Sequence, residues 1–419
     1  MNKVVIITLG CKQNKYESDC MANILACNGY VVSDKMQVAD IYIINTCAVT
    51  SEAEKKSRQY IMKCVKLNPD CKIIICGCAS ENNVEQFENK TNVYSILGTE
   101  GKQDILNYVS SAIKEKKVLS TIYDSPVMPI KTNTRENLKI QDGCNNFCSY
   151  CLIPYLRGRS RSRDLESIVD EANIIANRSH EIVLTGIDIS SYQIDGKPAL
   201  TKLMKALGGV HALISLGSLE ASVITEELLD VLQGMPNFSP HFHLSLQSGD
   251  NDILKLMNRH YSSDEFYEKV KLIKKYFPLA NITTDVIVGF CNETEEQFLN
   301  TKRFIEKCGF SFVHIFPYSK RKGTRAYNMV DLPSDVKKQR VDDLEIVNKN
   351  LKKKYLSQFV GKISTMLAEE QKELWEGFSR EYIRCYSDDV LEQGMIYNVK
   401  FLELYKDGLK VKIISKMEN

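Results

Sequence analysis

Short apolar runs alternate with amphipathic helical segments over the first quarter of the chain. Strands are expected at residues 4–9, 40–45, 72–76 and 93–97. The clearest helical pattern covers residues 52–67, where Ser51 and Glu54 fit a capping box at its start. Strands that alternate with helices predict an open parallel sheet covered on both faces.

A second alternating series begins after a polar stretch. Its strands are expected at residues 138–141, 181–185, 213–216, 242–246, 282–288 and 312–316. Six such units predict a partial or complete parallel α/β barrel. Residues 333–355 read as a basic helix, and the chain then changes to short strands at 362–368, 382–386, 395–405 and 409–414. This last pattern predicts a small all-β module.

These patterns divide the chain into three predicted domains. We expect an α/β domain at residues 1–119, a linker at 120–136, a barrel at 137–357 and a β-module at 358–419. The length of 419 residues agrees with more than one domain. No apolar run approaches the roughly 18 residues of a membrane span, and the apolar start is too short for a signal sequence. We therefore expect a cytoplasmic protein without a membrane partner.

The net charge of +2 conceals two basic segments. Residues 131–163 hold seven Lys and Arg against two acidic residues, a net of +5. Residues 320–355 hold eleven against five, a net of +6. Such clusters are typical of contact with a phosphate backbone, although solvated helix faces are the alternative.

Three cysteines lie close together after the first strand of the second series. Cys144, Cys148 and Cys151 have the spacing Cys-x₃-Cys-x₂-Cys, in a loop where α/β barrels place their chemistry. Iron–sulfur clusters normally have four cysteine ligands, so a three-cysteine loop indicates a cluster with one iron open to substrate. A zinc site is the alternative, but zinc usually takes four ligands in paired spacings, and no second pair follows.

Three further cysteines are separated along the chain but share a position. Cys11, Cys47 and Cys78 each come just after a predicted strand of the first series. Parallel strands present their carboxyl ends at one edge of a sheet, where ligands bind. A second three-thiolate cluster is therefore favoured over a coincidence of buried thiols. The other cysteines are interpreted as structural: Cys20, Cys27, Cys64, Cys71, Cys76, Cys291, Cys308 and Cys385.

The cysteine loop, with Tyr150 before its last cysteine, resembles the radical S-adenosylmethionine superfamily. Longer segments are similar to the methylthiotransferase family within it, at residues 8–18, 45–50, 56–59, 77–78 and 141–144. The resemblance implies an N-terminal α/β domain, a radical-SAM barrel and a C-terminal TRAM-like β-barrel. It also implies sulfur insertion into a C–H bond and delivery of a methylthio group.

Details of the first two cysteine segments resemble the branch that acts on N6-threonylcarbamoyladenosine at C2, 3′ of the tRNA anticodon. Lys12 stands where the branch that modifies a ribosomal protein aspartate usually has proline. The branch that acts on isopentenyladenosine more often carries a different motif around the first cysteine. Both branches stay open as alternatives, as does a tRNA-binding metalloprotein without enzymatic activity.

The resemblance implies two [4Fe–4S] clusters, S-adenosylmethionine, an electron donor of flavodoxin or ferredoxin type and a sulfur donor. One S-adenosylmethionine supplies the methyl group, and another supplies a 5′-deoxyadenosyl radical. The S-adenosylmethionine pocket is expected to be lined by Tyr150, Thr185, Gly186, Ser218, Glu220, Gln247 and Val288. At residues 291–292 this chain has Cys-Asn where the family usually has Pro-Gly, which puts the local turn in doubt.

Basic residues near the cysteine loop are candidates for gripping the tRNA anticodon stem-loop, because guanidinium groups bind phosphates and stack on bases. The set comprises Arg157, Arg159, Arg161, Arg163, Lys320, Arg321 and Lys322. The four arginines at alternate positions have an alternative role in internal ion pairs. In the β-module, stacking candidates are Trp375, Phe378, Tyr382 and Arg384.

Overall fold

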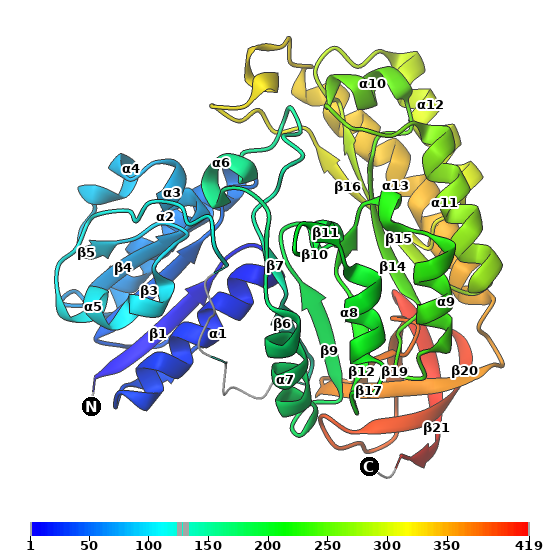
Figure 1. Ribbon diagram of the computed structural model, residues 1–419, viewed down its shortest axis with the longest axis horizontal. Helices are drawn as coiled ribbons and strands as arrows, with labels where there is room; N and C mark the ends of the chain where they lie inside the picture. Colours follow the sequence, from blue (N-terminus) through cyan, green and yellow to red (C-terminus); the bar gives the residue numbers. More distant parts are fainter. Residues whose placement is uncertain (1, 124–127, 129–133, 418–419) are drawn as a thin grey trace.

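The computed structural model describes residues 2–123, 128 and 134–417. Its N-terminal part is a parallel five-stranded sheet in the order β2-β1-β3-β4-β5, with helices on both faces (Figure 1). The strands are β1 (Lys3–Thr8), β2 (Val31–Ser33), β3 (Ile41–Thr46), β4 (Lys72–Gly77) and β5 (Val93–Ile96). The helices are α1 (Lys12–Cys27), α2 (Ser51–Leu67), α3 (Cys78–Asn82), α4 (Glu85–Glu88) and α5 (Ile105–Ser110).

The burial of these strands explains why their apolar pattern predicted the sheet. Every residue of β3 is buried, and successive side chains enter the two cores on opposite faces of the sheet. The four predicted strands are confirmed, whereas the short and partly exposed β2 was missed. The predicted capping box is wrong: Thr50 caps α2, and its hydroxyl accepts a hydrogen bond of 3.2 Å from the amide of Ala53.

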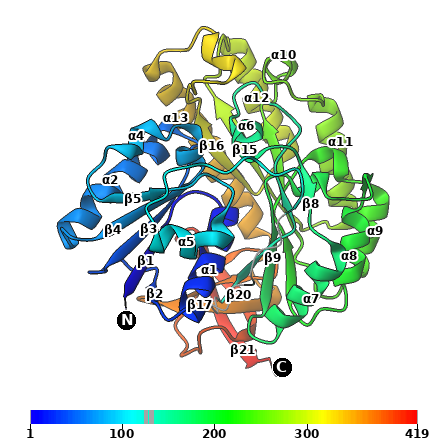
Figure 2. The same cartoon turned by 60° about the vertical axis from the view of Figure 1, so that its left-hand side comes forward.

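The second series forms a partial barrel of parallel strands. Its inner strands are β6 (Glu136–Lys139), β9 (Glu181–Thr185), β12 (Leu213–Leu216), β13 (Ser218–Leu219), β14 (His241–Gln247), β15 (Asn281–Val288) and β16 (Phe312–Pro317). Two hydrogen-bonded sheets, β12-β9-β6 and β13-β14-β15-β16, are joined by Gly217 between β12 and β13. Within the described residues β6 and β16 do not pair, so the barrel is open on that side (Figure 2).

Helices cover the outside of this barrel. They are α7 (Leu165–Ala176), α8 (Leu200–Leu207), α9 (Glu226–Gly234), α10 (Asn251–Leu256), α11 (Ser263–Tyr276), α12 (Glu295–Cys308) and α13 (Ser334–Ser357). Smaller elements lie in the connections: β7 (Gln141–Asp142), α6 (Ile153–Arg157), β8 (Arg161–Ser162), β10 (Gln193–Ile194) and β11 (Lys197–Pro198). The largest hydrophobic core lies between these helices and the strands.

The C-terminal residues close into a small barrel in the order β17-β18-β19-β21-β20. Its strands are β17 (Ile363–Gln371), β18 (Trp375–Ser379), β19 (Arg384–Ser387), β20 (Ile396–Tyr405) and β21 (Gly408–Lys416). The all-β prediction is confirmed, with β18 missed. This module lies against the end of the large barrel where β14 and β15 begin (Figure 1), and Asn281 donates to the carbonyl of Glu381 at 2.8 Å.

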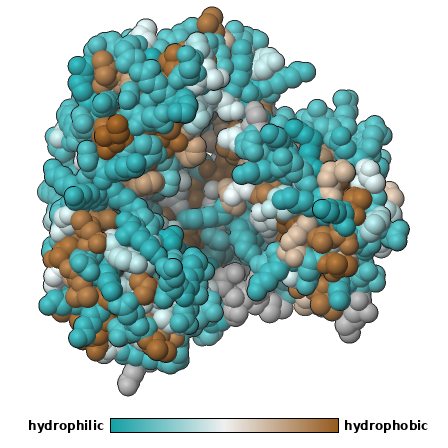
Figure 3. Space-filling model, turned by 180° about the vertical axis from the view of Figure 1, so that it is seen from behind, coloured by the Kyte–Doolittle hydropathy of each residue, from teal (hydrophilic) through white to brown (hydrophobic). Residues whose placement is uncertain are grey.

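The centre of the predicted linker lies outside the described residues. Among the helices that are described, none is long and apolar enough to cross a membrane. From behind, the space-filling view shows a hollow between the N-terminal lobe and the barrel, with a mostly hydrophilic rim (Figure 3). The functional residues described next lie where these two parts meet.

Candidate active site

The cysteines Cys144, Cys148 and Cys151 form one tight loop, here called the loop triad. The backbone amides of Asn146 and Ile153 each donate to a cysteine sulfur, of Cys144 and Cys151, at 3.4 Å. The amide of Asn258 supports the loop by donating to two of its carbonyls at 3.1 Å. Sulfurs that accept such bonds are typical of cluster-ligating thiolates.

Gly143 allows the tight backbone turn that leads into the loop triad. It has φ +73°, and a Cβ at this position would lie 2.0 Å from the carbonyl oxygen of Arg159. Burial, and to a lesser degree the carboxylate of Asp188 and the neighbouring thiols, raise the pKa of Cys144 to about 12. Burial likewise raises the pKa of Cys151, so these two thiols need a positive charge beside them to ionise. A cationic iron centre supplies that charge, so the residues present fit an iron–sulfur cluster.

Arg259 is a site residue that sequence reasoning missed. Its guanidinium donates to the sulfur of Cys148 at 3.3 Å, to the carbonyl of Ser245 at 3.1 Å and to the carboxylate of Glu220. It also donates to the hydroxyl of Tyr261 at 3.2 Å. Arg259 therefore connects the loop triad to the strand ends, although it lies 108 residues beyond Cys151. No local sequence pattern predicts this contact between Arg259 and the loop triad.

The residues predicted to bind S-adenosylmethionine gather near the carboxyl ends of neighbouring strands. Thr185 ends β9, Gln247 ends β14 with φ +68°, and Val288 ends β15. Tyr150 in the loop packs against Phe290, with ring centroids 6.3 Å apart. The remaining predicted residues, Gly186, Ser218 and Glu220, lie just after β9 and at or after β13. The structure brings these residues to one end of the barrel, and their role in binding S-adenosylmethionine stays a prediction.

The other three cysteines, Cys11, Cys47 and Cys78, also converge, and are called the strand-end triad. They follow β1, β3 and β4, which are neighbours in the sheet. A Cβ on Gly10, which has φ +94°, would lie 2.8 Å from the Cys47 sulfur. Burial and the charges of the other two thiols raise the pKa of Cys47 to about 11. Residues far apart in sequence thus form a three-thiol site.

The two triads lie next to each other. Burial raises the pKa of Cys151, and the charge of Cys78 from the other triad contributes to that shift. Helix α3, which begins at Cys78, packs against α6, which follows the loop triad. The two triads therefore meet where the N-terminal domain contacts the barrel.

Arg157 holds the two parts together and is only 1% exposed. Its guanidinium donates to Glu17 at 2.8 Å and to Asn14 at 2.7 Å, both on α1, and to Asp142 at 3.3 Å. Burial opposes its charged form, but Glu17 and Asp142 outweigh this and raise its pKa. The prediction that Arg157 grips tRNA is therefore wrong, because the side chain is already enclosed.

Three other predicted tRNA contacts are also corrected. Arg161 is buried against Glu100, Arg163 against Glu171, and Arg321 against Glu54 of α2. The alternative role of these arginines in internal ion pairs holds for Arg157, Arg161 and Arg163. Exposed cations remain for a tRNA surface: Arg159, Lys320 and Lys322.

The stacking candidates of the β-module face inward as well. Trp375 lies in the core of the module. Phe378 and Tyr382 hold the guanidinium of Arg135 at 4.9 and 4.8 Å from their ring centroids, and Tyr382 stacks on His241 at 4.5 Å. Phe378 and Tyr382 thus connect the module to the barrel, and both also line the large cavity between these two parts.

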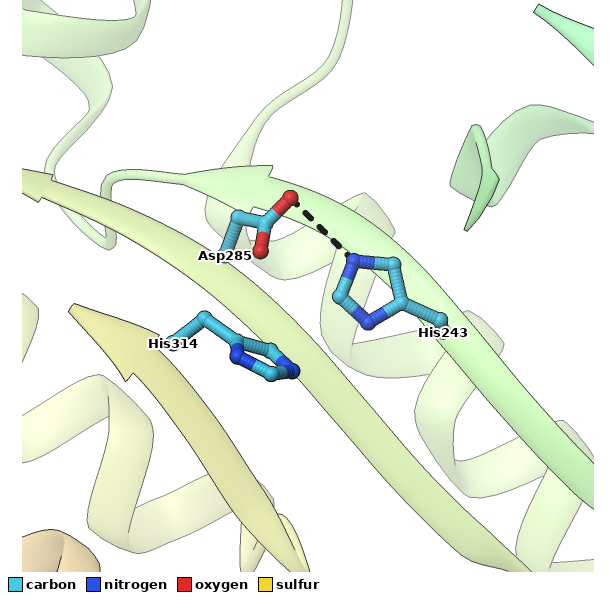
Figure 4. Close-up of side chains that lie close together, drawn as sticks. All are labelled: His243, Asp285 and His314. Atoms are coloured by element: carbon cyan, nitrogen blue, oxygen red, sulfur yellow. Dashed lines mark ion pairs between the residues drawn. The ribbon is translucent and has the colours of Figure 1, made fainter. Parts of the chain in front are cut away.

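A cavity of about 550 Å³ extends through the barrel toward this module. Ser218 lies in its wall, and so do Lys12 and the ring of His241. Inside it, His243, Asp285 and His314 come from β14, β15 and β16 and lie within 4.8 Å of one another (Figure 4). The Nε2 atom of His243 is 3.1 Å from Asp285. This cluster was not anticipated from the sequence.

Two family models match the chain. Residues 138–305 match the radical SAM superfamily, and residues 3–98 match the uncharacterized protein family UPF0004. A protein of Bacillus subtilis (strain 168), "Threonylcarbamoyladenosine tRNA methylthiotransferase MtaB", is 36% identical over 99% of this chain and 97% of its own length. This chain belongs to the radical SAM methylthiotransferase family. Membership implies a [4Fe–4S] cluster and S-adenosylmethionine, which the loop triad and its surroundings fit.

Other relatives carry two different names. An Aquifex aeolicus protein with the same name as the Bacillus relative is 36% identical over 90% of this chain and 95% of its own length. A Thermodesulfovibrio yellowstonii protein named tRNA-2-methylthio-N(6)-dimethylallyladenosine synthase is 32% identical over 98% of this chain and 99% of its own length. Family membership is thus settled independently of which nucleoside is modified.

Solved structures support the fold. The radical SAM methyltransferase TsrM of Kitasatospora setae has a TM-score of 0.58 at 12% identity, with 78% of this chain and 77% of that chain covered. The cobalamin-dependent radical enzyme OxsB has a TM-score of 0.53 at 12% identity, over 83% of this chain and 56% of that chain. At such identities the likeness concerns architecture alone.

Proposed function

We propose that this enzyme methylthiolates C2 of N6-threonylcarbamoyladenosine in tRNA, next to the anticodon on its 3′ side. The observation that carries the proposal is the pair of adjacent cysteine triads in a chain whose full-length relative in Bacillus is named for this nucleoside. One triad fits the radical-generating cluster of the family. The second lies where a sulfur-carrying centre would face it.

The second cluster is part of the proposal. Cys11, Cys47 and Cys78 supply three thiols at one sheet edge, as three ligands of a [4Fe–4S] cluster require. Arg157 donates to Glu17 of α1 and interacts electrostatically with Cys78, so it is suited to hold this triad near the loop. Bound clusters would supply electron transfer and a carrier for sulfur.

The remaining residues have positioning roles in this proposal. Glu220, fixed by Arg259, is suited to accept hydrogen bonds from the ribose or amino group of S-adenosylmethionine. The exposed Arg159 lies over the ring of Phe147 at 4.4 Å, beside the loop triad, and suits a phosphate of the anticodon loop. An external reductant of flavodoxin or ferredoxin type and a sulfur donor complete the reaction.

The proposal is tested by expressing the chain in a bacterial strain that makes threonylcarbamoyladenosine but lacks 2-methylthio derivatives. Digested tRNA is analysed by mass spectrometry. We expect the 2-methylthio-threonylcarbamoyl nucleoside to appear with the wild-type chain and not with Cys148→Ala. Appearance of 2-methylthio-isopentenyladenosine instead would assign the enzyme to the other tRNA branch.

A further inference from the structure

The cavity inside the barrel carries an excess of positive groups. Its wall contains two lysines and one arginine, but only two carboxylates, Asp285 and Asp407. Three histidines also line it, and burial lowers the pKa of two of them, His241 and His314. Asp407 lies 3.4 Å from Arg384 and 3.9 Å from Lys352, so it is matched within the wall. The other carboxylate, Asp285, is bound by His243 at 3.1 Å.

Lys12 is the cation left without an acidic partner. Among the described residues it makes no hydrogen bond and no ion pair, although it faces the cavity from the first turn of α1. Glu181, which interacts with it electrostatically, is already bound by Arg135 at 2.8 Å. An ammonium group in such surroundings is stabilised by an incoming anion.

His314 lies on β16 in the wall of the same cavity, and its ring makes no hydrogen bond within the described part of the chain. Its ring centroid lies 4.8 Å from that of Phe312. The ring centroid of His243 is 5.4 Å away (Figure 4). It therefore keeps its donor capacity available to a ligand. The neighbouring His243 does not, because its Nδ1 is 2.8 Å from the hydroxyl of Thr283 and its Nε2 faces Asp285.

We propose that Lys12 and His314 form a carboxylate subsite that receives the threonyl end of the N6 substituent of the substrate base. The inference rests on the proposed function and adds to it the residues that select the substituent. Phe312, Phe316 and Leu216 in the same wall contact its carbon atoms. An apolar isopentenyl group would offer Lys12 no counter-charge, and this disfavours the other nucleoside.

The position of Lys12 means that the N-terminal domain and the barrel would both contact the substrate. It comes from the N-terminal domain, next to Cys11 of the strand-end triad, whereas His314 comes from the barrel. The subsite is complete only when both parts are in place. Anchoring of the carboxylate there would orient the base relative to both triads.

The test measures binding, not turnover. Reconstituted enzyme is titrated with synthetic anticodon stem-loops that carry threonylcarbamoyladenosine, or its neutral carboxamide analogue, at the same position. For the wild type we expect the carboxylate form to bind about 10-fold to 100-fold more tightly, as for a charge-assisted hydrogen bond. Lys12→Gln and His314→Gln should each reduce this ratio to below about 3-fold, and Lys12→Arg should retain most of it.

Lys15→Gln is the matched control, because Lys15 lies on the same helix but pairs with Asp19 at 2.7 Å. Its preference should equal that of the wild type. Iron content is measured for every variant, and His314→Gln lies on a strand that carries neither triad. A wild type that prefers the carboxylate form, with a preference unchanged in both glutamine variants, overturns the subsite.

Two further outcomes are decisive. A stoichiometric extra metal that His314→Gln removes would show that the cluster in Figure 4 is a metal site and would overturn the carboxylate subsite. Failure of the proposed function has a separate signature, namely no 2-methylthio-threonylcarbamoyl nucleoside in tRNA from cells that express the wild type. The two failures are therefore distinguishable.

Discussion

The two cysteine triads reach the same result by different routes. The loop triad spans eight residues from Cys144 to Cys151, and its shape is set by local hydrogen bonds and one glycine turn. The strand-end triad spans 68 residues from Cys11 to Cys78, and its shape is set by the order of three parallel strands. The first is a property of a peptide segment, and the second is a property of a folded sheet.

This difference predicts how each triad responds to amino-acid substitutions. A change in one residue of the loop triad removes a ligand but leaves the sheet intact. A change that shifts one strand or one domain disturbs the strand-end triad without touching a cysteine. The following experiments separate the two, from the largest expected effect to the smallest.

Removal of a ligand from each triad should have different consequences. In Cys148→Ala we expect cleavage of S-adenosylmethionine to fall below about 1% of wild type, because the cluster that binds it is lost. In Cys47→Ala cleavage should continue within about 3-fold while methylthiolation stops. Each variant should lose about four of about eight irons per chain, measured after anaerobic reconstitution. Equal loss of cleavage in both variants would contradict separate roles.

Arg157→Met breaks the connection between the triads. It removes one of the cations that Glu17 and Asp142 share, while Lys139 still pairs with them at 3.0 and 2.7 Å. We expect a loss of about 1 to 3 kcal/mol in the free energy of unfolding, because buried hydrogen bonds are lost but neither carboxylate is left without a counter-charge. Chemical denaturation measures it. Arg159→Met, two residues away and exposed, should change stability by no more than about 0.5 kcal/mol.

Gly10→Ala tests the strand-end triad alone. The added methyl would lie 2.8 Å from the Cys47 sulfur, in a backbone conformation at φ +94° that costs about 1 to 3 kcal/mol for other residues. Iron should be lost from this triad only, and cleavage of S-adenosylmethionine should persist. Gly29→Ala is the control, since it has φ +83° but nothing within 4 Å of the added methyl. It should keep both clusters.

Acid should weaken the contact between the two parts. Burial opposes ionisation of Glu17, but Arg157, Lys102 and Lys139 outweigh it and hold the pKa of this carboxyl well below its usual range. Its contribution to stability is therefore complete above about pH 4.5 and is lost as the pH falls. In metal-free protein, Glu17→Gln should reduce the loss of unfolding free energy between pH 6 and pH 3 by about 1 kcal/mol or more. An unchanged pH profile would contradict this role.

The exposed cations should have the smallest effects. Arg159→Ala and Lys322→Ala should each weaken tRNA binding about 3-fold and lower the slope of log affinity against log salt by about 1. Both side chains are exposed, in contrast to the buried arginines of the same run. Filter binding at several salt concentrations measures the slope. A slope that equals that of the wild type in both variants would place the tRNA elsewhere.

Periodicity was sufficient for most of the architecture because most parallel strands of the N-terminal domain and of the barrel are buried and apolar. It failed at β2 and β18, which are short or partly exposed, and at the start of α2, where two hydroxyl residues are adjacent and Thr50 is the one that caps. Both cysteine triads were found, since one has a spacing and the other a shared place after strands.

Side-chain partners were the least predictable part of the site. The run of alternating arginines has the same appearance whether it faces RNA or carboxylates, and only the arrangement of Glu17, Glu100 and Glu171 decides it. Arg259 and the His243 cluster depend on contacts between strands distant in sequence. The sequence gives the charge of a side chain, but the partner that it faces depends on the fold.

The strand-end triad also sets an order for maturation of the enzyme in the cell. A nascent chain that has released residues 144–151 already carries all three cysteines of the loop triad next to one another. The other three thiols become neighbours only once β1, β3 and β4 have paired. Under the proposed function, delivery of iron and sulfide to that edge must therefore follow folding of the N-terminal domain, whereas the loop triad has its three thiols together as soon as that segment is made.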